Sequence, residues 1–184
     1  PLEPRPYKIL PGSDSSVWTT GIQLSSTPTY ASRFDGERWH RYGPRDETTI
    51  TTWDGMLDSR NRFWFFQDGY VSFDGDSLQM EIPRDALPAA DLNGSILGKD
   101  DHLWLGSNDR GLFRWNGASW DNYIIADGLP ANDMLPLGAG SNGTIWAMSG
   151  ENLAWFDGKT WNVRRLSDKV SQNCAFDRNG AIWM

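Results

Sequence analysis

A tryptophan recurs along this chain at intervals of roughly 40 residues, each time in the same local setting. The residue just before it favours strands, and the residue three positions before it tolerates a tight turn. A setting copied at this period is typical of proteins that stack repeated supersecondary units, so it constrains the fold more than any other feature. The recurring tryptophans are Trp18, Trp64, Trp104, Trp146 and Trp183. The turn-forming residues ahead of them are Ser15, Asn61, Asp101, Gly143 and Gly180.

A second landmark lies between these tryptophans: an aromatic residue followed by Asp or Asn and then by Gly. Asp-Gly and Asn-Gly supply the positive φ angles of a type I′ turn, so we expect a tight hairpin at each copy. A large apolar residue follows three positions after the glycine. The landmark occurs at Phe34–Gly36, Phe73–Gly75, Trp115–Gly117 and Phe156–Gly158, and the apolar residues after it are Trp39, Leu78, Trp120 and Trp161.

Each copy holds four strand-like segments, which predicts an all-β protein of four-stranded antiparallel sheets. Four strands and repeated aromatic residues per unit are typical of β-propeller blades. We expect a single β-propeller domain over residues 1–184, with four blades and a partial fifth, as a segment of a larger propeller; an imperfectly closed five-bladed ring is the alternative. The expected units lie near residues 7–42, 50–82, 92–125, 134–166 and 172–184. The third unit predicts strands near Leu92–Lys99, Leu103–Ser107, Leu112–Trp115 and Trp120–Ile125.

Two stretches carry a more specific likeness. Asp177–Trp183 has the form Asp-x-x-Gly-x-Ile-Trp, and Trp104–Pro130 contains Gly-Leu-Phe-Arg-Trp-Asn-Gly, then Trp, then Gly-Leu-Pro. Both resemble the two-component regulator propeller repeat, and the resemblance covers almost the whole chain. It implies a propeller like the periplasmic sensor regions of hybrid histidine kinases, many of which are linked to polysaccharide-derived ligands. It implies a periplasmic or extracellular location. The first unit departs most from the repeat, through its longer connection at Ser25–Thr29.

Composition excludes some classes of partner. The net charge of −7 argues against nucleic acid, because phosphate binding needs a basic face. It also argues against docking on anionic lipid, and no apolar run is long enough to span a membrane. Cys174 is the single cysteine and lies in an apolar run, so we interpret it as a structural thiol rather than a reactive one.

The sequence predicts no catalytic residue, no metal site and no cofactor. His40 and His102 fall at different positions of the repeat, and neither has a Ser or Cys partner at a recognisable spacing. Two His and one Cys do not suggest a zinc site. The acidic turns, such as Asp74–Asp76, lack the pattern of a calcium loop and are explained by turn formation.

Polar loops provide the candidate binding residues. In an antiparallel blade, the loop after the second strand and the loop after the fourth strand lie at one end, and binding usually resides on such loops. Most of the tryptophans occupy repeat positions and are expected to be framework; Trp53 and Trp155 do not. Trp53, beside Asp54-Gly55, could offer a stacking surface for a sugar ring. The candidate ligand-binding residues are Trp53, Arg45, Asp46, Gln67, Asp68, Arg84, Asn108, Asp109, Arg110, Glu151 and Asn152.

The sequence thus favours a non-catalytic sensing or recognition propeller whose ligand is a small molecule or an oligosaccharide. A protein-interaction scaffold, with the acidic surface as the contact, is the first alternative. A propeller enzyme resembling the streptogramin lyases is the second, and the small number of histidines argues against it.

Overall fold

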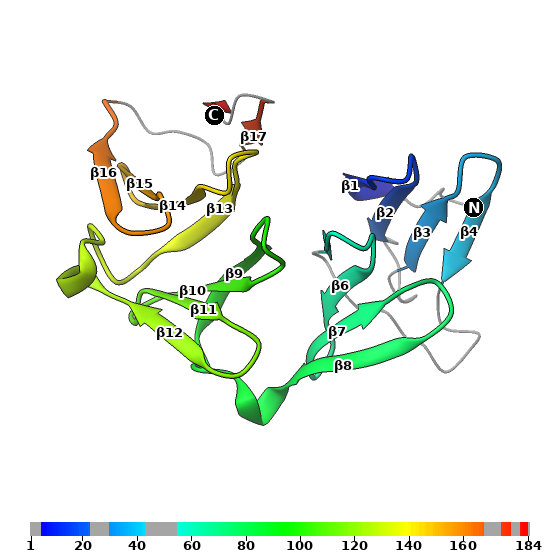
Figure 1. The fold of residues 1–184 in the computed structure, drawn as a ribbon, viewed down its shortest axis with the longest axis horizontal. Coiled ribbons are helices and arrows are strands. Elements are labelled where there is room, and N and C mark those ends of the chain that lie inside the picture. The colour runs from blue at the N-terminus through cyan, green and yellow to red at the C-terminus, as the bar shows by residue number, and fades with distance from the viewer. Residues whose placement is uncertain (1–4, 23–29, 43–54, 168–173, 178–180, 184) are drawn as a thin grey trace. The chain divides into compact units, whose positions relative to one another are not determined.

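The computed structural model describes residues 5–22, 30–42, 55–167, 174–177 and 181–183 (Figure 1). In this part of the chain the strands form four four-stranded antiparallel sheets and one two-stranded sheet. Within each sheet the strands pair in chain order, which is the blade topology predicted from the repeat. The chain divides into two compact units, Pro1–Leu87 and Pro88–Met184. Among the described residues, no helix has the length and apolar character that crossing a membrane would require.

The first unit holds blades 1 and 2. Blade 1 consists of β1 (Arg5–Pro11), β2 (Val17–Ile22), β3 (Tyr30–Phe34) and β4 (Trp39–Tyr42). Blade 2 consists of β5 (Met56–Leu57), β6 (Phe63–Phe66), β7 (Gly69–Phe73) and β8 (Leu78–Pro83), and a short 3₁₀ turn, η1 (Arg84–Ala86), follows it.

The second unit holds blades 3 and 4 and the two-stranded sheet. Blade 3 consists of β9 (Leu92–Leu97), β10 (Leu103–Ser107), β11 (Leu112–Trp115) and β12 (Trp120–Tyr123), followed by η2 (Ile125–Asp127). Blade 4 consists of β13 (Leu135–Ala139), β14 (Ile145–Ser149), β15 (Asn152–Phe156) and β16 (Trp161–Arg165). The two-stranded sheet pairs β17 (Ala175–Phe176) with β18 (Ile182–Trp183). The predicted strand positions of the third unit are therefore confirmed.

The turn that enters the second strand is left-handed where the sequence predicted it. The residue three positions before the tryptophan has a φ of 66° at Ser15, 61° at Asn61, 60° at Asp101 and 85° at Gly143. Such angles favour Gly, Asn, Asp and other small residues, so the residue types at this position follow from the backbone. The fifth copy, at Gly180, lies outside the described residues.

The turn between the third and fourth strands is not the predicted type I′ turn. In blade 1, Phe34 faces Trp39 across the ladder, which leaves four residues in the loop, and among them only Gly36 has a positive φ, of 101°. The Asp35 carboxylate accepts the backbone N–H groups of Glu37 and Arg38, both at 2.9 Å. This Asx turn satisfies the loop backbone through a side chain and replaces the two-residue hairpin. In the other three four-stranded blades, the backbone N–H groups two and three residues ahead donate in the same way to the side chains of Asp74, Asn116 and Asp157.

The core of the first unit lies between its two blades. Trp18 is fully buried, and its ring stacks on Phe63 of blade 2 with centroids 5.2 Å apart and planes 11° apart. Phe73 meets the same indole edge-on at 6.1 Å, and Tyr42 of blade 1 stacks on it at 5.6 Å. Trp18, which the sequence predicts to be a framework residue, therefore packs against the next blade.

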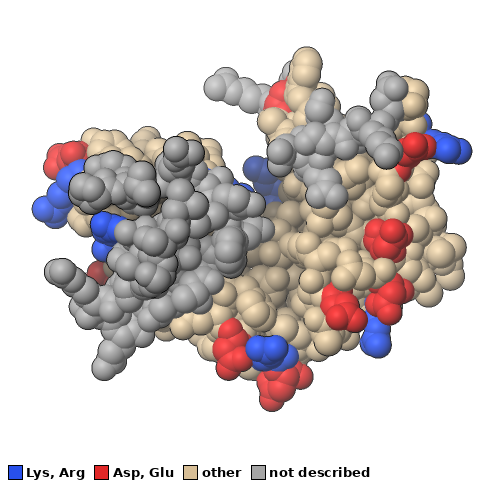
Figure 2. Space-filling view, turned by 180° about the vertical axis from the view of Figure 1, so that it is seen from behind, with Lys and Arg blue, Asp and Glu red and all other residues tan. Residues whose placement is uncertain are grey.

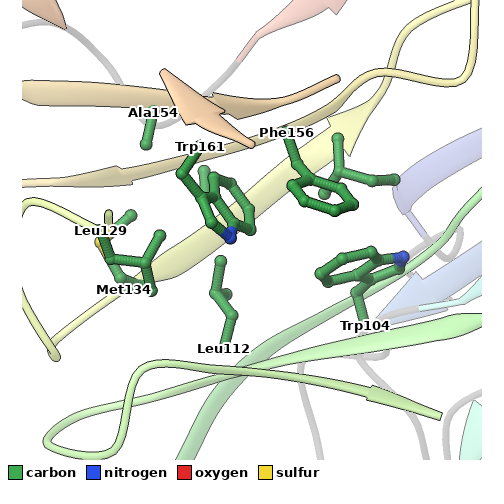
Figure 3. Close-up of a cluster of buried hydrophobic side chains, with 9 residues drawn as sticks. Trp104, Leu112, Leu129, Met134, Ala154, Phe156 and Trp161 are labelled. Atoms are coloured by element: carbon green, nitrogen blue, oxygen red, sulfur yellow. The ribbon is translucent and has the colours of Figure 1, made fainter. Parts of the chain in front are cut away.

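The core of the second unit repeats this arrangement between blades 3 and 4. Trp104 is 2% exposed and contacts the rings of Phe156 at 5.8 Å and Trp161 at 6.1 Å; Figure 3 shows the three rings converging. Leu129, from the Gly-Leu-Pro sequence after blade 3, is buried in the same cluster. The Gly-Leu-Pro segment therefore anchors its loop to the core.

A flat group also lies over the second-strand indole of each four-stranded blade. Arginines from the third strand cover the indoles of blades 1 and 3, an arginine from the preceding turn covers that of blade 2, and a second indole covers that of blade 4. The pairs are Arg33 over Trp18 (5.8 Å), Arg114 over Trp104 (5.7 Å), Arg62 over Trp64 (5.6 Å) and Trp155 beside Trp146 (5.4 Å). Trp155 is therefore a packing residue of blade 4.

Two repeat tryptophans differ from the expected framework role. Trp39, at the start of β4, is 58% exposed, and Trp183, at the end of β18, is 67% exposed.

Cys174 is half-buried with its Sγ 3.7 Å from the carbonyl oxygen of Leu137, and burial raises the pKa of its thiol. A raised pKa is what an unreactive thiol requires.

Candidate ligand-binding loops

The first unit brings three candidate residues to one end of blade 2. Gln67 and Asp68 form the turn between β6 and β7, and Arg84 begins η1 directly after β8. Gly69 pairs with Pro83 across the ladder, so the turn and η1 leave the sheet at the same end. The Asp68 carboxylate lies 3.6 Å from the Arg84 guanidinium, and both side chains are largely exposed. Because both side chains are exposed, the ion pair contributes little to stability, and its charges are accessible to a ligand.

The backbone holds this turn firmly. Asp68 and Gly69 both have positive φ, of 54° and 132°, and the Gln67 N–H donates to the Gly69 carbonyl at 2.7 Å. A Cβ on Gly69 would lie 2.4 Å from the Ile82 carbonyl oxygen, so only glycine allows this close approach of β7 and β8. The exposed Asp68 side chain therefore extends from a fixed turn, whereas the Oε1 of Gln67 is buried.

Phe66 belongs to the same corner and was missed in the sequence analysis. It is the last residue of β6, it is 39% exposed, and its ring meets Tyr70 edge-on at 5.4 Å. The position two residues after the framework tryptophan holds Thr20, Gly106 and Met148 in the other four-stranded blades. An aromatic residue that only blade 2 carries there was the available signal. We call Phe66, Gln67, Asp68 and Arg84 the blade 2 corner.

The second unit presents Asn108, Asp109 and Arg110 in the loop between β10 and β11. Asp109 and Arg110 are exposed, and the Arg110 Nε lies 3.9 Å from the Asp109 Oδ1. The Asn93 side-chain amide donates a hydrogen bond to the Asn108 Oδ1 at 3.2 Å. The loop backbone is tied down at several points: the Arg110 N–H donates to Ser107 Oγ at 2.7 Å, and the Asn108 N–H donates to the Asp91 carbonyl at 3.2 Å. The loop carries amides and charges but no exposed aromatic residue.

Glu151 and Asn152 lie at the corresponding end of blade 4. Glu151 accepts hydrogen bonds from the Arg165 guanidinium, with the closer nitrogen at 3.1 Å, and its carbonyl accepts the Leu166 N–H at 2.8 Å. Asn152 is the first residue of β15 and pairs with Ser149 and Arg165, so it is part of the sheet rather than of the loop. These two residues are held mainly by their own blade.

Three predicted site residues, Trp53, Arg45 and Asp46, lie outside the described residues. The remaining ones fall into two groups in separate compact units: Gln67, Asp68 and Arg84 in the first, and the others in the second. Each group is therefore a candidate by itself. Figure 2 shows acidic and basic side chains interspersed over the described surface on the face seen there.

The two histidines lie at the other end of their blades, beside turns. His40 Nε2 lies 2.5 Å from the Asp35 carboxylate, and His102 Nδ1 lies 2.7 Å from that of Asp100. The pKa of Asp35 is held well below its usual range, first by the Arg38 backbone N–H and then by His40. Burial raises the pKa of Asp100, but the His102 charge and hydrogen bonds outweigh this and lower it. Within the described ranges, no group of three or more His, Cys, Asp or Glu side chains could hold a metal ion.

No protein-family model matches the chain, and no curated protein matches its sequence. Among solved structures, it is similar to the virginiamycin B lyase from Staphylococcus aureus, with a TM-score of 0.61 and 16% identity over 94% of this chain and 60% of that one. It is similar to the extracellular domain assigned to a hybrid two-component system, BT3049, from B. thetaiotaomicron, with a TM-score of 0.67 and 16% identity over 99% of this chain and 27% of that one.

A gluconolactonase from Xanthomonas campestris gives a TM-score of 0.59 and 17% identity, over 94% of this chain and 65% of that one. The chain thus spans 60% of the lyase and 27% of the BT3049 domain. At these identities the likeness concerns the fold, and it confirms the all-β propeller prediction. Enzymes and sensor domains both occur among the similar structures, so the fold by itself does not select a function.

Proposed function

We propose that this propeller recognises an extracellular ligand without catalysing a reaction, and that the ligand is a carbohydrate. The observation that carries the proposal is the blade 2 corner, where the partly exposed Phe66 ring and the exposed Asp68–Arg84 pair lie at the same end of one sheet. Aromatic faces pack against the apolar faces of sugar rings, and planar amide, carboxylate and guanidinium groups hydrogen-bond ring hydroxyls in two directions. The fixed turn keeps the ordering cost of binding low.

The likeness to the extracellular domain of BT3049 supports a sensor of the two-component type, in a periplasmic or extracellular location. The resemblance of Trp104–Pro130 to the two-component regulator propeller repeat points the same way. The non-catalytic part of the proposal is supported by the two histidines: each contacts an Asp carboxylate beside a turn, at the end of the blade remote from the candidate loops. A lyase or lactonase activity is the alternative that the similar enzymes suggest.

The test is a titration of the protein with a panel of neutral and acidic oligosaccharides, followed by calorimetry. For a glycan that binds, Phe66→Ala and Arg84→Ala should each weaken the affinity by about tenfold, as expected when one well-placed contact is lost. Arg38→Ala is the matched control, because Arg38 is an equally exposed arginine in a turn at the opposite end of blade 1; it should change the affinity less than about twofold.

Two results would count against the proposal. One is a panel in which no oligosaccharide binds. The other is binding that Phe66→Ala, Arg84→Ala and Arg38→Ala leave equally unchanged, which would place the ligand away from the blade 2 corner.

A further inference from the structure

The sequence contains the dipeptide Asn-Gly four times, and the structure describes three of the copies. In this dipeptide the glycine nitrogen can attack the Asn side chain readily, because glycine has no Cβ to hinder the approach. The attack displaces ammonia and closes a succinimide ring, which water opens to Asp or isoaspartate. The described copies are Asn93-Gly94, Asn116-Gly117 and Asn142-Gly143, and Asn179-Gly180 lies outside the described residues.

The copy at Asn116 leaves the attacking nitrogen free. Within the described ranges of the chain, the Gly117 N–H has no hydrogen-bond acceptor. The Asn116 Oδ1 accepts the N–H groups of Ala118 and Ser119, at 3.0 and 2.9 Å. The side chain is therefore folded over the turn that contains the Gly117 nitrogen. Because this nitrogen donates no hydrogen bond, it can act as a nucleophile without first breaking one.

The same turn offers groups that would assist the reaction. Attack on the side-chain carbonyl places negative charge on Oδ1, and the two N–H groups that already donate to Oδ1 would stabilise that charge. The Asn116 Nδ2 donates to the Ser119 Oγ at 3.1 Å. A hydroxyl at this distance can give a proton to the nitrogen that leaves as ammonia. The turn thus combines a free nucleophile, a polarised carbonyl and a proton donor.

The other two described copies lack this combination. The Gly143 N–H donates to the Gly140 carbonyl at 2.9 Å, so the nucleophile of that copy is occupied. Asn93 lies in β9, and its Nδ2 donates to the Asn108 Oδ1 of the β10–β11 loop at 3.2 Å. That side chain is therefore held by another segment instead of by its own turn. Three identical dipeptides thus differ in reactivity because of their surroundings.

The Asp-Gly copies of the same turn are protected by their charge. A carboxylate resists attack by a nucleophile and has no good leaving group, so only the protonated acid would react. The pKa values of these carboxyls are lowered, first by the hydrogen bond from the backbone N–H three residues ahead, so they stay ionised at neutral pH. The protected copies are Asp35, Asp74 and Asp157.

We propose that Asn116 is a site of spontaneous deamidation in the folded protein, assisted by its own turn. The Gly117 nitrogen bonds to the Asn116 Cγ, the bond from Cγ to Nδ2 breaks, and the amide proton leaves with ammonia; one water molecule then opens the ring. Opening to Asp adds one negative charge and gives blade 3 the residue that blades 1, 2 and 4 have at this position. The proposal does not depend on the ligand proposed above, since this turn is not one of the candidate binding loops.

Incubation of the folded chain in mildly alkaline buffer, followed by peptide mass spectrometry, measures the loss of ammonia at each copy. Asn116 should react about fivefold or more faster than Asn142, because the Gly143 nitrogen must first give up a hydrogen bond. The same incubation in concentrated urea is the matched control: the copies share one dipeptide, so their rates should become similar. A rate at Asn116 in the folded protein that is equal to or below that at Asn142 would overturn the proposal.

Ser119→Ala tests the assistance by the turn. It removes the hydroxyl but keeps the backbone N–H that donates to Oδ1, and Arg38 at the same position of blade 1 shows that the turn forms without a hydroxyl. The variant should keep the wild-type melting temperature and should lose ammonia at Asn116 about tenfold more slowly, with Asn142 unchanged. An unchanged rate at Asn116 would overturn the assisted reaction.

Discussion

Replacing Asp58 by Ala should destabilise the first unit more than its single charge suggests. The Asp58 side chain is fully buried, and it accepts four hydrogen bonds. Oδ1 accepts the backbone N–H groups of Arg60 and Arg62, at 3.0 and 2.9 Å. Oδ2 accepts Arg62 Nε at 2.7 Å and Trp64 Nε1 at 3.0 Å. One carboxylate thus fixes the turn, the arginine over the indole and the indole itself.

The magnitude follows from which of these donors lose their partner. Arg62 keeps its bonds to Glu81 and to Ser72, so its charge stays paired. The buried indole N–H of Trp64 and the two backbone N–H groups lose their acceptor, and each unsatisfied buried donor costs about 1–3 kcal/mol. Because Arg62 stays paired with Glu81, the penalty of an uncompensated buried charge does not add to these costs. We therefore expect Asp58→Ala to lower the free energy of unfolding by about 4 kcal/mol.

Urea unfolding followed by tryptophan fluorescence measures this loss. Asp74→Ala is the control in the same unit: Asp74 also accepts two backbone N–H groups and one side-chain donor, but in an exposed turn. Water can replace the acceptor there, so the cost should be about 1 kcal/mol. If the two variants lost equal stability, burial of the Asp58 network would not be the cause. Asp58→Asn, which keeps Oδ1 but places an NH₂ group against two donors, should fall between them.

Two further predictions concern the turns and the core. The pKa values of the Asx-turn carboxylates are lowered, first by the hydrogen bond from the backbone N–H three residues ahead, so these carboxylates stabilise the fold above the unfolded pKa of 3.8 and lose this contribution as the pH falls below it. Replacing all three by Asn, the residue that blade 3 has at this position, should therefore reduce the fall in melting temperature between neutral and acid pH. An unchanged fall would refute this. The carboxylates are Asp35, Asp74 and Asp157. Gly106→Ala would place a Cβ 2.3 Å from the Met134 carbonyl oxygen and should cost about 1–3 kcal/mol in urea unfolding, and wild-type stability in this variant would contradict the close approach of β10 to blade 4.

The repeat made the strands and the left-handed turns predictable because each depends on local residue types. Asn61 and Asp101 stand where only a turn-tolerant residue fits, and Trp18 and Trp104 pack as their common position suggested. The type I′ prediction failed at Asp35 because side-chain capture of backbone N–H groups depends on loop length, and the Asp-Gly pair alone does not fix that length.

The exposed fraction of a side chain could not be predicted from its position in the repeat. Trp39 and Trp161 have the same position in their copies, yet one is 58% and the other 8% exposed, and Trp161 contacts Trp104 of the blade before it. Phe66 could not be predicted from the repeat, because its position has a different residue type in each blade. Of the candidate site, the sequence indicated the polar loops, but their grouping with Phe66 required the sheet register.

The paired indoles have a spectroscopic consequence. Trp146 and Trp155 lie 5.4 Å apart, and Trp115 and Trp120 lie 5.1 Å apart, with planes inclined by 30° and 51°. Neighbouring chromophores at such separations couple their electronic transitions, which produces paired circular-dichroism bands of opposite sign in the far ultraviolet. These bands overlap the weak peptide signal of β-strands. Ellipticity in that region will therefore follow the packing of the indole pairs during melting as well as the loss of the strands.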